Sequence, residues 1–537
     1  MVLICKPEQS GKTFIMIEQI IKDVEEPTEG KTTINFIFCD NNLLQTKQTS
    51  ARVQSELTSH EEEVSGEVEG EIICNDERSY TEKNFYVEFS TGKGAKRDIP
   101  AIWFAITGPE PVQNIVCCTN GKRVSDIETI IRQFNSTPNF QDKYIFNIWL
   151  DEADKFTNFI GKTFRPLVHQ NDNVQLYFLT ATPGELFKKY GDLNTFPLEF
   201  TTSPNYHGWN DNYKTILENE SGTTEGFIHH VLTNVVSARR GSKWYIPAGT
   251  KKVTHELVRD ILLGKGFAVF VVNGDGLALS VPGEGRICEK KTEELNIQML
   301  RMYREKNVAH FPVAVTGNIC VGRGISIMSP EFIFDYGILS NCAKKAEASQ
   351  NAGRLKSNMK DWPNYKPPTV FTTAKFDKVA TEWEKKSRHL AEIAFENQEA
   401  GVSTVISKTA FKTVGEDFKY IKHPESFTTI KDVRDFLATV KERMGLKSNP
   451  RPEDYSKHKE QCGGYLVTSK LLTKGRKAKD LTADDRLTRE KVNSISEGYG
   501  LSNTKGGKWI VLPFYENMDT PADQVQYQVR YVNRRMD

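Results

Sequence analysis

This chain of 537 residues lacks a run of apolar residues long enough to cross a bilayer, since a spanning helix needs about 18–20 of them in succession. The apolar stretch at residues 2–5 is too short for the core of a secretory signal, and it leads into a charged loop. Both absences predict a soluble, intracellular protein with no membrane partner.

Paired metal-binding cysteines are also missing. The nine cysteines include no CxxC pair, and only Cys117 and Cys118 are close neighbours. This pattern argues against zinc ribbons and a disulfide framework, and it suits a reducing compartment. His229 and His230 have no companion ligands at zinc-site spacing, which favours surface or packing roles for both.

The chain has little net charge, +1 at pH 7. A protein of this kind does not bind nucleic acid with its whole surface, so any nucleic-acid site must be a local patch or groove. Residues 401–537 hold 25 Lys and Arg against 18 Asp and Glu. This excess suits contact with nucleic acid or a protein partner, and it is equally typical of an ordinary solvated surface.

What the sequence does contain is a repeated alternation of apolar strands and helix-like stretches. Because single cores stop growing at about 250–300 residues, we expect two or three domains. The near-continuous apolar strands predict an α/β fold with parallel sheets covered on both faces. In the first part of the chain, strands are expected at residues 2–5, 33–39, 102–107, 114–118, 146–150 and 175–179.

The alternation restarts after a polar stretch at residues 201–235, which we interpret as a connector. Strands are expected at residues 244–246, 267–272, 311–315, 332–336 and 369–371, and helices at residues 253–263, 293–306, 380–398 and 430–444. We predict three domains, namely residues 1–205 with an acidic insertion at about residues 60–100, residues 206–390, and a smaller C-terminal accessory domain at residues 391–537.

Residues 6–13 read KPEQSGKT and lie between a predicted strand and a predicted helix. Backbone N–H groups at a helix N-terminus attract phosphates, Lys12 adds a full positive charge, and the Thr13 hydroxyl is a candidate Mg²⁺ ligand. The alternative is an ordinary capped turn. We favour a nucleotide-binding loop whose candidate ligands are Gln9, Ser10, Gly11, Lys12 and Thr13.

An acidic quartet at residues 151–154 follows the apolar strand 145–150. Ligands of open α/β sheets bind at the carboxyl ends of the strands, where this quartet is expected. Asp151 is therefore a candidate Mg²⁺ ligand, and Glu152 a candidate base for the attacking water. An isolated quartet would be read as a solvated loop, but the upstream phosphate loop favours catalysis.

The set of motifs resembles that of superfamily 2 helicases, whose DEAD-type members carry Asp-Glu-Ala-Asp, found here at residues 151–154. Residues 180–182 (TAT) are similar to motif III, which in that family links ATP hydrolysis to strand separation. Residues 316–326 look like motif V, and residues 350–354 (QNAGR) look like motif VI. Residues 40–46 and 119–121 are similar to strand-binding motifs. The resemblance covers residues 1 to about 380.

The resemblance implies two tandem RecA-like domains that hydrolyse ATP, with Mg²⁺, in the cleft between them. The implied catalytic residues are Lys12, Asp151, Glu152 and Arg354, with further nucleotide contacts by Gln350 and Gly324. Thr180 and Thr182 would couple hydrolysis to movement. The phosphates of a nucleic-acid strand would be gripped by Asn41, Asn42, Thr119, Asn120 and Thr316.

Two positions and one missing motif depart from the family's pattern. Ser357 occupies the place of a second motif VI arginine, which leaves Arg354 to act alone or with help from Lys356. Motif VI begins with Gln350 rather than His, and the adenine-reading motif of DEAD-box proteins has no room before Met1. These departures favour a broader relative, similar to helicases of large DNA viruses and phages.

We therefore expect an ATP-dependent helicase or translocase that acts on single-stranded DNA or RNA, or on a duplex with a single-stranded region. One alternative is a motor that remodels double-stranded DNA without unwinding it. Another is a structural nucleic-acid-binding protein whose ATPase has decayed, which the missing second arginine permits.

Overall fold

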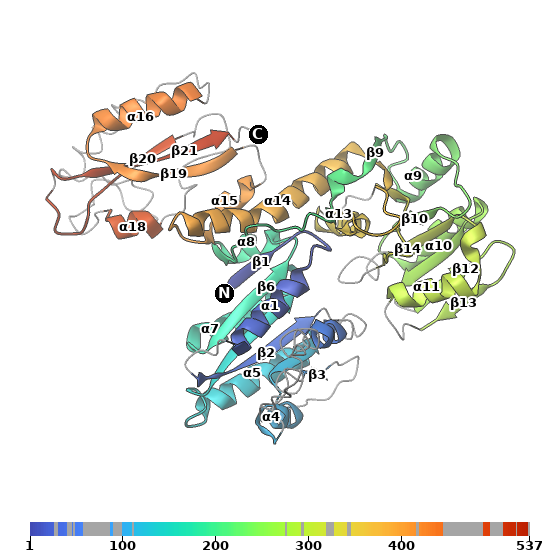
Figure 1. Cartoon of the computed structure of the whole chain (residues 1–537), viewed down its shortest axis with the longest axis horizontal. Coiled ribbons are helices and arrows are strands. Elements are labelled where there is room, and N and C mark those ends of the chain that lie inside the picture. The colour runs from blue at the N-terminus through green and yellow to red at the C-terminus, as the bar shows by residue number, and fades with distance from the viewer. Residues whose placement is uncertain are drawn as a thin grey trace, which may run out of the picture. The chain divides into compact units, whose positions relative to one another are not determined.

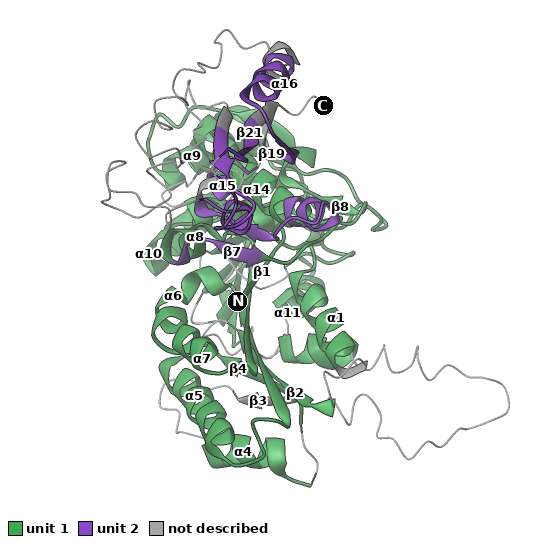
Figure 2. Ribbon diagram, turned by 90° about the vertical axis from the view of Figure 1, so that its left-hand side faces the viewer, with its two compact units in different colours: residues 1–189, 195–392 green, residues 190–194, 393–537 purple. Residues whose placement is uncertain are grey.

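The computed structural model of the chain describes residues 1–25, 30–39, 46, 49–56, 86–89, 99–109, 112–273, 276–290, 295–317, 327–340, 345–414, 418–443, 487–494, 509–521 and 523–534. They form two compact units, shown in separate colours in Figure 2. Unit 1 comprises residues 1–189 and 195–392, and unit 2 comprises residues 190–194 and 393–537. Within these ranges, no helix combines the length and apolar character needed to span a bilayer.

The N-terminal half of unit 1, which we call lobe 1, is built on a parallel sheet with strand order β1-β6-β5-β2-β4-β3 (Figure 1). The strands are β1 (Val2–Cys5), β2 (Thr32–Cys39), β3 (Tyr86–Phe89), β4 (Asn114–Cys118), β5 (Tyr144–Asp151) and β6 (Val174–Thr180). The helices are α1 (Lys12–Glu25), α4 (Ile99–Thr107), α5 (Gly121–Ser136), α6 (Thr157–Phe159), α7 (Arg165–Gln170) and α8 (Gly184–Tyr190), with short turns η2 (Ala153–Lys155) and η3 (Ile160–Phe164).

Helices cover both faces of the lobe 1 sheet because its strands are apolar on both sides. Figure 2 shows α1 on one side of the sheet and α5 and α7 on the other. On the α1 side, Ile17 and Ile20 pack with Ile4 and Trp149 in one buried cluster. On the opposite side, Phe134 of α5 makes an edge contact with the Phe146 ring of β5, with ring centroids 5.4 Å apart.

The second half of unit 1, lobe 2, contains a sheet of strand order β13-β12-β11-β14-β10-β15-β17-β9. Its strands are β9 (Tyr213–Ile216), β10 (Lys243–Tyr245), β11 (Ala268–Asn273), β12 (Gly276–Ser280), β13 (Arg286–Glu289), β14 (Val313–Gly317), β15 (Tyr336–Leu339) and β17 (Thr369–Thr372). β12 pairs antiparallel with both β11 and β13, whereas the other neighbours pair parallel. Buried clusters lie on both faces of this sheet. The predicted α/β class with two parallel-sheet domains is confirmed.

Lobe 2 also contains helices and short elements outside its main sheet. The helices are α9 (Thr224–His230), α10 (Lys252–Gly264), α11 (Leu295–Glu305), α13 (Lys345–Ala352) and α14 (Ala374–Glu399), which continues into unit 2. The short turns are η4 (Trp209–Asp211), η5 (Val231–Val235), η6 (Val308–His310) and η7 (Gly353–Leu355). β8 (Tyr206–His207) and β16 (Ser357–Asn358) pair with each other in a two-stranded sheet.

The strand predicted at residues 102–107 is wrong, because this segment belongs to helix α4. In a short run of consecutive apolar residues, periodicity cannot distinguish a buried strand from a buried helix. Pro100 sits in the first turn of α4, where its missing N–H is tolerated, and Ile102 and Ile106 bury the same helix face. The better signal was therefore the proline together with apolar residues four positions apart.

Three other expectations need adjustment. The strand predicted at residues 332–336 begins only at Tyr336, in β15. The polar stretch 201–235 is more than a connector, since it supplies β9, an edge strand of the lobe 2 sheet that pairs with β17. The insertion at residues 60–100 lies mostly outside the described residues, although β3 within it pairs parallel with β4.

Unit 2 has a different architecture from the two lobes. β19 (Phe418–Phe427), β21 (Gln526–Arg534) and β20 (Trp509–Phe514) form a three-stranded antiparallel sheet in that order. Helix α16 (Ile430–Arg443) packs on it through Val433 and Leu437. The remaining elements are β18 (Val405–Ile406), α15 (Lys408–Thr413), α18 (Arg489–Ser494) and β7 (Leu193–Thr195), whose last residue belongs to unit 1. The expected partner contact of this region stays a prediction.

Candidate active site

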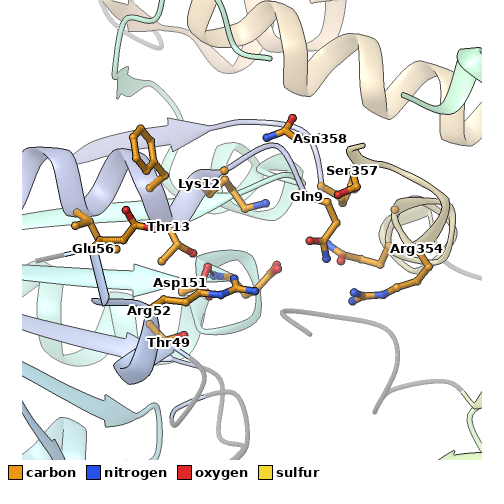
Figure 3. Close-up of a pocket in the computed structure, with 17 residues that line it drawn as sticks. Gln9, Lys12, Thr13, Thr49, Arg52, Glu56, Asp151, Arg354, Ser357 and Asn358 are labelled. Atoms are coloured by element: carbon orange, nitrogen blue, oxygen red, sulfur yellow. Dashed lines mark hydrogen bonds between the residues drawn. The ribbon is translucent and has the colours of Figure 1, made fainter. Parts of the chain in front are cut away.

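One cavity of unit 1 is lined by residues from both lobes, and its volume is 310 Å³. This lies at the lower end of the range of roughly 300–1,000 Å³ that is usual for small-molecule sites. Figure 3 shows Lys12, Thr13 and Asp151 on one side of the cavity and Arg354 on the other. The lining residues are Glu8, Gln9, Gly11, Lys12, Thr13, Phe14, Ile17, Thr49, Arg52, Glu56, Asp151, Glu152, Gln350, Gly353, Arg354, Ser357 and Asn358.

The loop between β1 and α1 forms the first wall of this cavity. Helix α1 begins at Lys12, so the helix N-terminus carries that lysine at the cavity edge. Gln9 and Gly11 have positive φ values of 58° and 88°, a left-handed backbone that glycine adopts without strain and glutamine only at a cost. A helix N-terminus with an adjacent lysine attracts an anion.

Two residues of this loop, Ser10 and Lys6, do not line the cavity. Ser10 is absent from the cavity lining, and its hydroxyl donates a hydrogen bond to the Pro7 carbonyl at 2.8 Å. Ser10 therefore stabilises the loop with its side chain. Lys6, the first residue of the segment 6–13, is buried, and burial together with the charge of Lys12 lowers its pKa.

Asp151 ends strand β5, and Glu152 follows it in a left-handed conformation (φ 53°, ψ 43°). The Glu152 N–H donates to Asp151 Oδ1 at 3.0 Å. A non-glycine residue with positive φ is uncommon and is often found at functional sites. Here it turns the chain at the carboxyl edge of the sheet, and both carboxylates line the cavity.

Asp154 connects this turn to the next strand. Its Oδ1 accepts a hydrogen bond from the Thr180 hydroxyl at 2.9 Å, and its Oδ2 accepts one from the Thr182 hydroxyl at 3.1 Å. Both threonines are buried, so these bonds hold the end of β6 to the acidic turn. The two residues predicted to couple hydrolysis to movement therefore contact a carboxylate two positions after Glu152.

The opposite wall comes from α13 and η7 of lobe 2. Gln350 lies in α13 and Arg354 lies in η7. Both residues line the cavity, and each has only 4% of its surface exposed. Burial lowers the pKa of Arg354, and Tyr245, Glu152 and Glu8 act in the opposite direction. A desolvated guanidinium beside a cavity is stabilised when an anion binds, because its charge has lost water.

A buried ionic network joins the two walls below the cavity. Lys356 Nζ lies 3.1 Å from Glu8 Oε2 and 3.0 Å from Glu384 Oε2, and the Lys356 side chain is fully buried. Ser349 donates a further hydrogen bond to Glu8. The Tyr206 hydroxyl donates to the Glu8 carbonyl at 2.9 Å. Lys356 is thus engaged in the contact between lobes and is absent from the cavity lining, contrary to its expected help to Arg354.

The residues present fit a Mg²⁺ ion that is bound chiefly by phosphate and water. No group of three or more His, Cys, Asp or Glu side chains arranged to hold a metal ion occurs in the part of the chain that the structure describes. Mg²⁺ at nucleotide sites commonly uses only one or two protein oxygens. The Asp151 carboxylate and the Thr13 hydroxyl line the same cavity and are such a pair.

Other predicted site residues lie elsewhere or have structural partners. Thr119 is buried and its hydroxyl donates to the Cys39 carbonyl, whereas Asn120 caps α5 by accepting from the Lys122 and Arg123 N–H groups. Thr316 is fully buried in β14. Asn41, Asn42 and Gly324 lie outside the described residues. The nucleotide contact of Gly324 and the nucleic-acid contacts of the other positions stay predictions.

The cavity also contains residues to which the sequence assigned no role, above all Glu8, Arg52 and Gly353. For Glu8 the signal was an acidic residue in a loop predicted to bind phosphate, since an unpaired carboxylate there would repel the phosphate and a cationic partner is therefore expected. For Gly353 the signal was its place before Arg354 in the motif. Arg52 carries no local signal, since only packing brings it to the cavity.

No protein-family model matches the sequence, and no curated protein matches it. Among solved structures, the chain is similar to Mss116p (NTE and C-tail double deletion) bound to ssRNA and AMP-PNP, at 11% identity and TM-score 0.37 over 69% of this chain and 65% of that chain. It is similar to Mycobacterium smegmatis helicase Lhr bound to ssDNA and AMP-PNP, at 12% identity and TM-score 0.36 over 74% of this chain and 46% of that chain.

A third similar structure is the RNA-helicase Prp28 from Chaetomium thermophilum bound to ADP, at 12% identity and TM-score 0.21 over 75% of this chain and 79% of that chain. The chain therefore spans 65% and 46% of the length of the first two structures.

Proposed function

We propose that this chain is a helicase-type motor, an ATPase that depends on nucleic acid and uses hydrolysis between lobes 1 and 2 to move along or unwind DNA or RNA. The proposal depends on one observation. Lys12, Asp151 and Glu152 of lobe 1 line the same cavity as Gln350 and Arg354 of lobe 2. A lysine at a helix N-terminus, two carboxylates and an opposing arginine are the groups that phosphoryl transfer requires.

In this proposal the triphosphate binds at the N-terminus of α1, where Lys12 and backbone N–H groups neutralise its charge. Thr13 and Asp151 would hold Mg²⁺, which supplies further neutralisation of the phosphate oxygens when bound. Gln350 and Arg354 reach the terminal phosphate from lobe 2. The nucleotide therefore contacts both lobes and favours their closed arrangement.

Hydrolysis follows from the same arrangement. Glu152 accepts a proton from a water molecule whose oxygen attacks the γ-phosphorus, and the bond to the bridging oxygen of ADP breaks. Arg354 neutralises charge on the transferring group, a role worth about 10³–10⁵-fold in related phosphoryl-transfer enzymes. Release of phosphate removes the group that both lobes contact, so the lobes can separate.

Movement requires that a structural change at the nucleotide site is transmitted to the bound nucleic acid. The hydrogen bonds from Thr180 and Thr182 to Asp154 give a direct link from the acidic turn to the end of β6. We expect the strand to be gripped through its phosphates, which is independent of base sequence and weakens with salt.

The test is a nucleotide-hydrolysis screen of the full chain with single-stranded and double-stranded DNA and RNA. We expect ATP hydrolysis that is stimulated by at least one single-stranded nucleic acid, with less stimulation as salt rises. Hydrolysis that no nucleic acid stimulates would contradict the motor function. Stimulation by duplex DNA alone, with triplex displacement but no strand displacement, would instead identify a double-strand translocase.

A further inference from the structure

A second arginine, Arg52, reaches the cavity from lobe 1. It belongs to the helical residues 49–56, and its half-buried side chain lines the cavity together with Thr13, Asp151 and Arg354. Figure 3 shows the side chain extending into the cavity beside Asp151, whereas Glu56 lies further from the cavity centre. Arg52 therefore faces the place where we expect the phosphates.

The position of Arg52 is determined by its neighbours in the helix. Val53 is fully buried and packs in the same cluster as Ile17 of α1 and Trp149 of β5. Thr49 and Ser50 are also buried, while Glu56 is exposed. Because Val53 anchors this helix on the lobe 1 core, the preceding residue is directed to the cavity edge.

The cationic side chains around the cavity are few, and they come from both lobes. Lys356, one residue before the position where related motors carry a second arginine, is buried between Glu8 and Glu384, and Ser357 at that position is uncharged. Among the described residues that line the cavity, the cationic side chains are Lys12, Arg52 and Arg354. Lobe 2 thus supplies one arginine, and lobe 1 supplies the other.

We propose that Arg52 is a second phosphate-facing arginine, which contacts the γ-phosphate of the bound nucleotide from the ATP-binding lobe itself. This inference rests on the proposed function for the identity of the ligand. Guanidinium groups bind phosphate oxygens with two parallel hydrogen bonds, and their charge does not depend on pH in the physiological range. A guanidinium group only donates hydrogen bonds, so the proton from the attacking water still goes to Glu152.

Arg52 differs from Arg354 in one testable respect. Arg52 lies on the same lobe as Lys12, so its contact with the terminal phosphate does not require closure of lobe 2. We therefore expect Arg52 to distinguish a triphosphate from a diphosphate even in the absence of nucleic acid. The competing explanation is a surface ion pair between Arg52 and Glu56, which stand four residues apart on one helix.

The experiment uses the full chain with Arg52→Ala, Arg52→Lys and the control Arg132→Ala. Arg132 is a half-exposed arginine of α5 in the same lobe that pairs with Glu128 at 3.1 Å. The affinities for AMP-PNP and ADP, each with Mg²⁺, are measured together with kcat and KM. We expect Arg52→Ala to weaken AMP-PNP binding by about tenfold or more, to change ADP binding by less than about threefold, and to lower kcat by about 100-fold or more.

Arg52→Lys should recover part of the triphosphate preference, because it keeps the charge but loses the two-pronged geometry. Equal losses for AMP-PNP and ADP in Arg52→Ala, or no change in either, would overturn the assignment to the γ-phosphate. If the wild-type chain binds nucleotide but hydrolyses none, the proposed function fails, yet the ratio of the two affinities still decides the role of Arg52. Circular dichroism and the unfolding midpoint show whether each variant is folded.

Discussion

Lys356 and Glu8 form a buried ion pair that joins lobe 2 to the loop between β1 and α1 of lobe 1. Their charged atoms lie 3.1 Å apart, and Glu384 accepts a second contact from the same ammonium group at 3.0 Å. The side chains of Glu8 and Glu384 are each only 5% exposed. Two carboxylates and one lysine therefore share a site from which water is largely excluded.

Replacing Lys356 should destabilise unit 1 strongly. In Lys356→Met, Glu8 and Glu384 lose their shared cation in a buried site, and loss of one partner of a buried pair costs about 3–5 kcal/mol. Denaturant unfolding followed by circular dichroism measures the change. Lys360→Met is the control, since Lys360 pairs with Asp211 at 3.0 Å near the surface. This substitution should lower the free energy of unfolding by less than about 1 kcal/mol. Equal losses of unfolding free energy in the two variants would contradict the importance of the buried pair.

The same pair predicts how stability depends on pH. Burial alone would raise the pKa of Glu8, but Lys356, Ser349 and Lys12 outweigh it, so the pKa lies below its ordinary value of 4.5. Burial alone would lower the pKa of Lys356, but Glu8 and Glu384 outweigh it, so the pKa lies above 10.5. The contribution of Glu8 is therefore complete above its ordinary pKa and is lost as pH falls through the lowered pKa. That of Lys356 is complete below its ordinary pKa and is lost as pH rises through the raised pKa.

We expect the stability difference between the wild type and Lys356→Met to be largest from about pH 5 to about pH 10 and to shrink at lower pH. Unfolding midpoints measured from pH 3 to pH 8 test this. A difference that is still undiminished at pH 3 would show that packing, rather than charge, accounts for the effect of the substitution.

Gly353→Ala should disturb the contact between the lobes without removing any charge. A Cβ atom at Gly353 would lie 2.7 Å from Glu8 Cβ and 2.9 Å from Glu8 Cγ, which is too close for carbon atoms. The phosphate loop and Arg354 must then separate, and displacements of about 1 Å can cost about 100-fold in rate. We expect a fall in kcat of at least tenfold. Gly264→Ala, where an added Cβ meets nothing within 4 Å, should retain the wild-type rate.

Glu152→Gln should separate nucleotide binding from hydrolysis. The amide keeps the size of the side chain but cannot accept a proton from water, and loss of a general base lowers rates by about 10²–10⁴-fold. Binding of ATP, measured by fluorescence of a labelled analogue, should persist. Lys12→Ala should lose both binding and hydrolysis, and Glu185→Gln, at an exposed position of α8, should lose neither. Near-normal turnover in Glu152→Gln would mean that another residue acts as the base.

Loss of the threonine contacts should affect movement more than hydrolysis. In a Thr180→Ala, Thr182→Ala double variant, Asp154 loses two hydrogen bonds that hold β6 to the acidic turn. Coupling between sites typically amounts to about 5–150-fold, so we expect strand displacement to fall in that range while ATP hydrolysis stays within about threefold. Serine at both positions keeps the hydroxyls and should restore displacement. A parallel loss of both activities would contradict a coupling role.

Much of the candidate site could be predicted because its residues follow strands. Lys12 and Thr13 come after β1, and Asp151 and Glu152 come at the end of β5, and all four line the cavity. Apolar runs identify such strands locally, and the carboxyl ends of parallel strands meet at one edge of a sheet. Ser10 belongs to the same loop but turns its hydroxyl to Pro7, which a motif cannot indicate.

Local sequence was least informative where packing decides between alternatives. The apolar residues 102–107 fit a strand or a helix equally, and packing against α5, where the Trp103 ring centroid lies 4.3 Å from that of Phe134, accompanies the helix α4. Thr119 and Thr316 follow or end strands, as site residues often do, yet their side chains are buried in lobes 1 and 2. Position in the chain does not reveal which way such a side chain turns.

Most of the strands, the loop at residues 6–13 and the acidic turn were determined by the sequence itself, because each depends on residues that are neighbours in the chain. Only the tertiary structure decided that Arg52 enters the cavity and that Lys356 is buried against Glu8, 348 positions away along the chain. Contacts of this kind depend on how cores pack and how two lobes meet, and those arrangements leave no periodic pattern in the sequence.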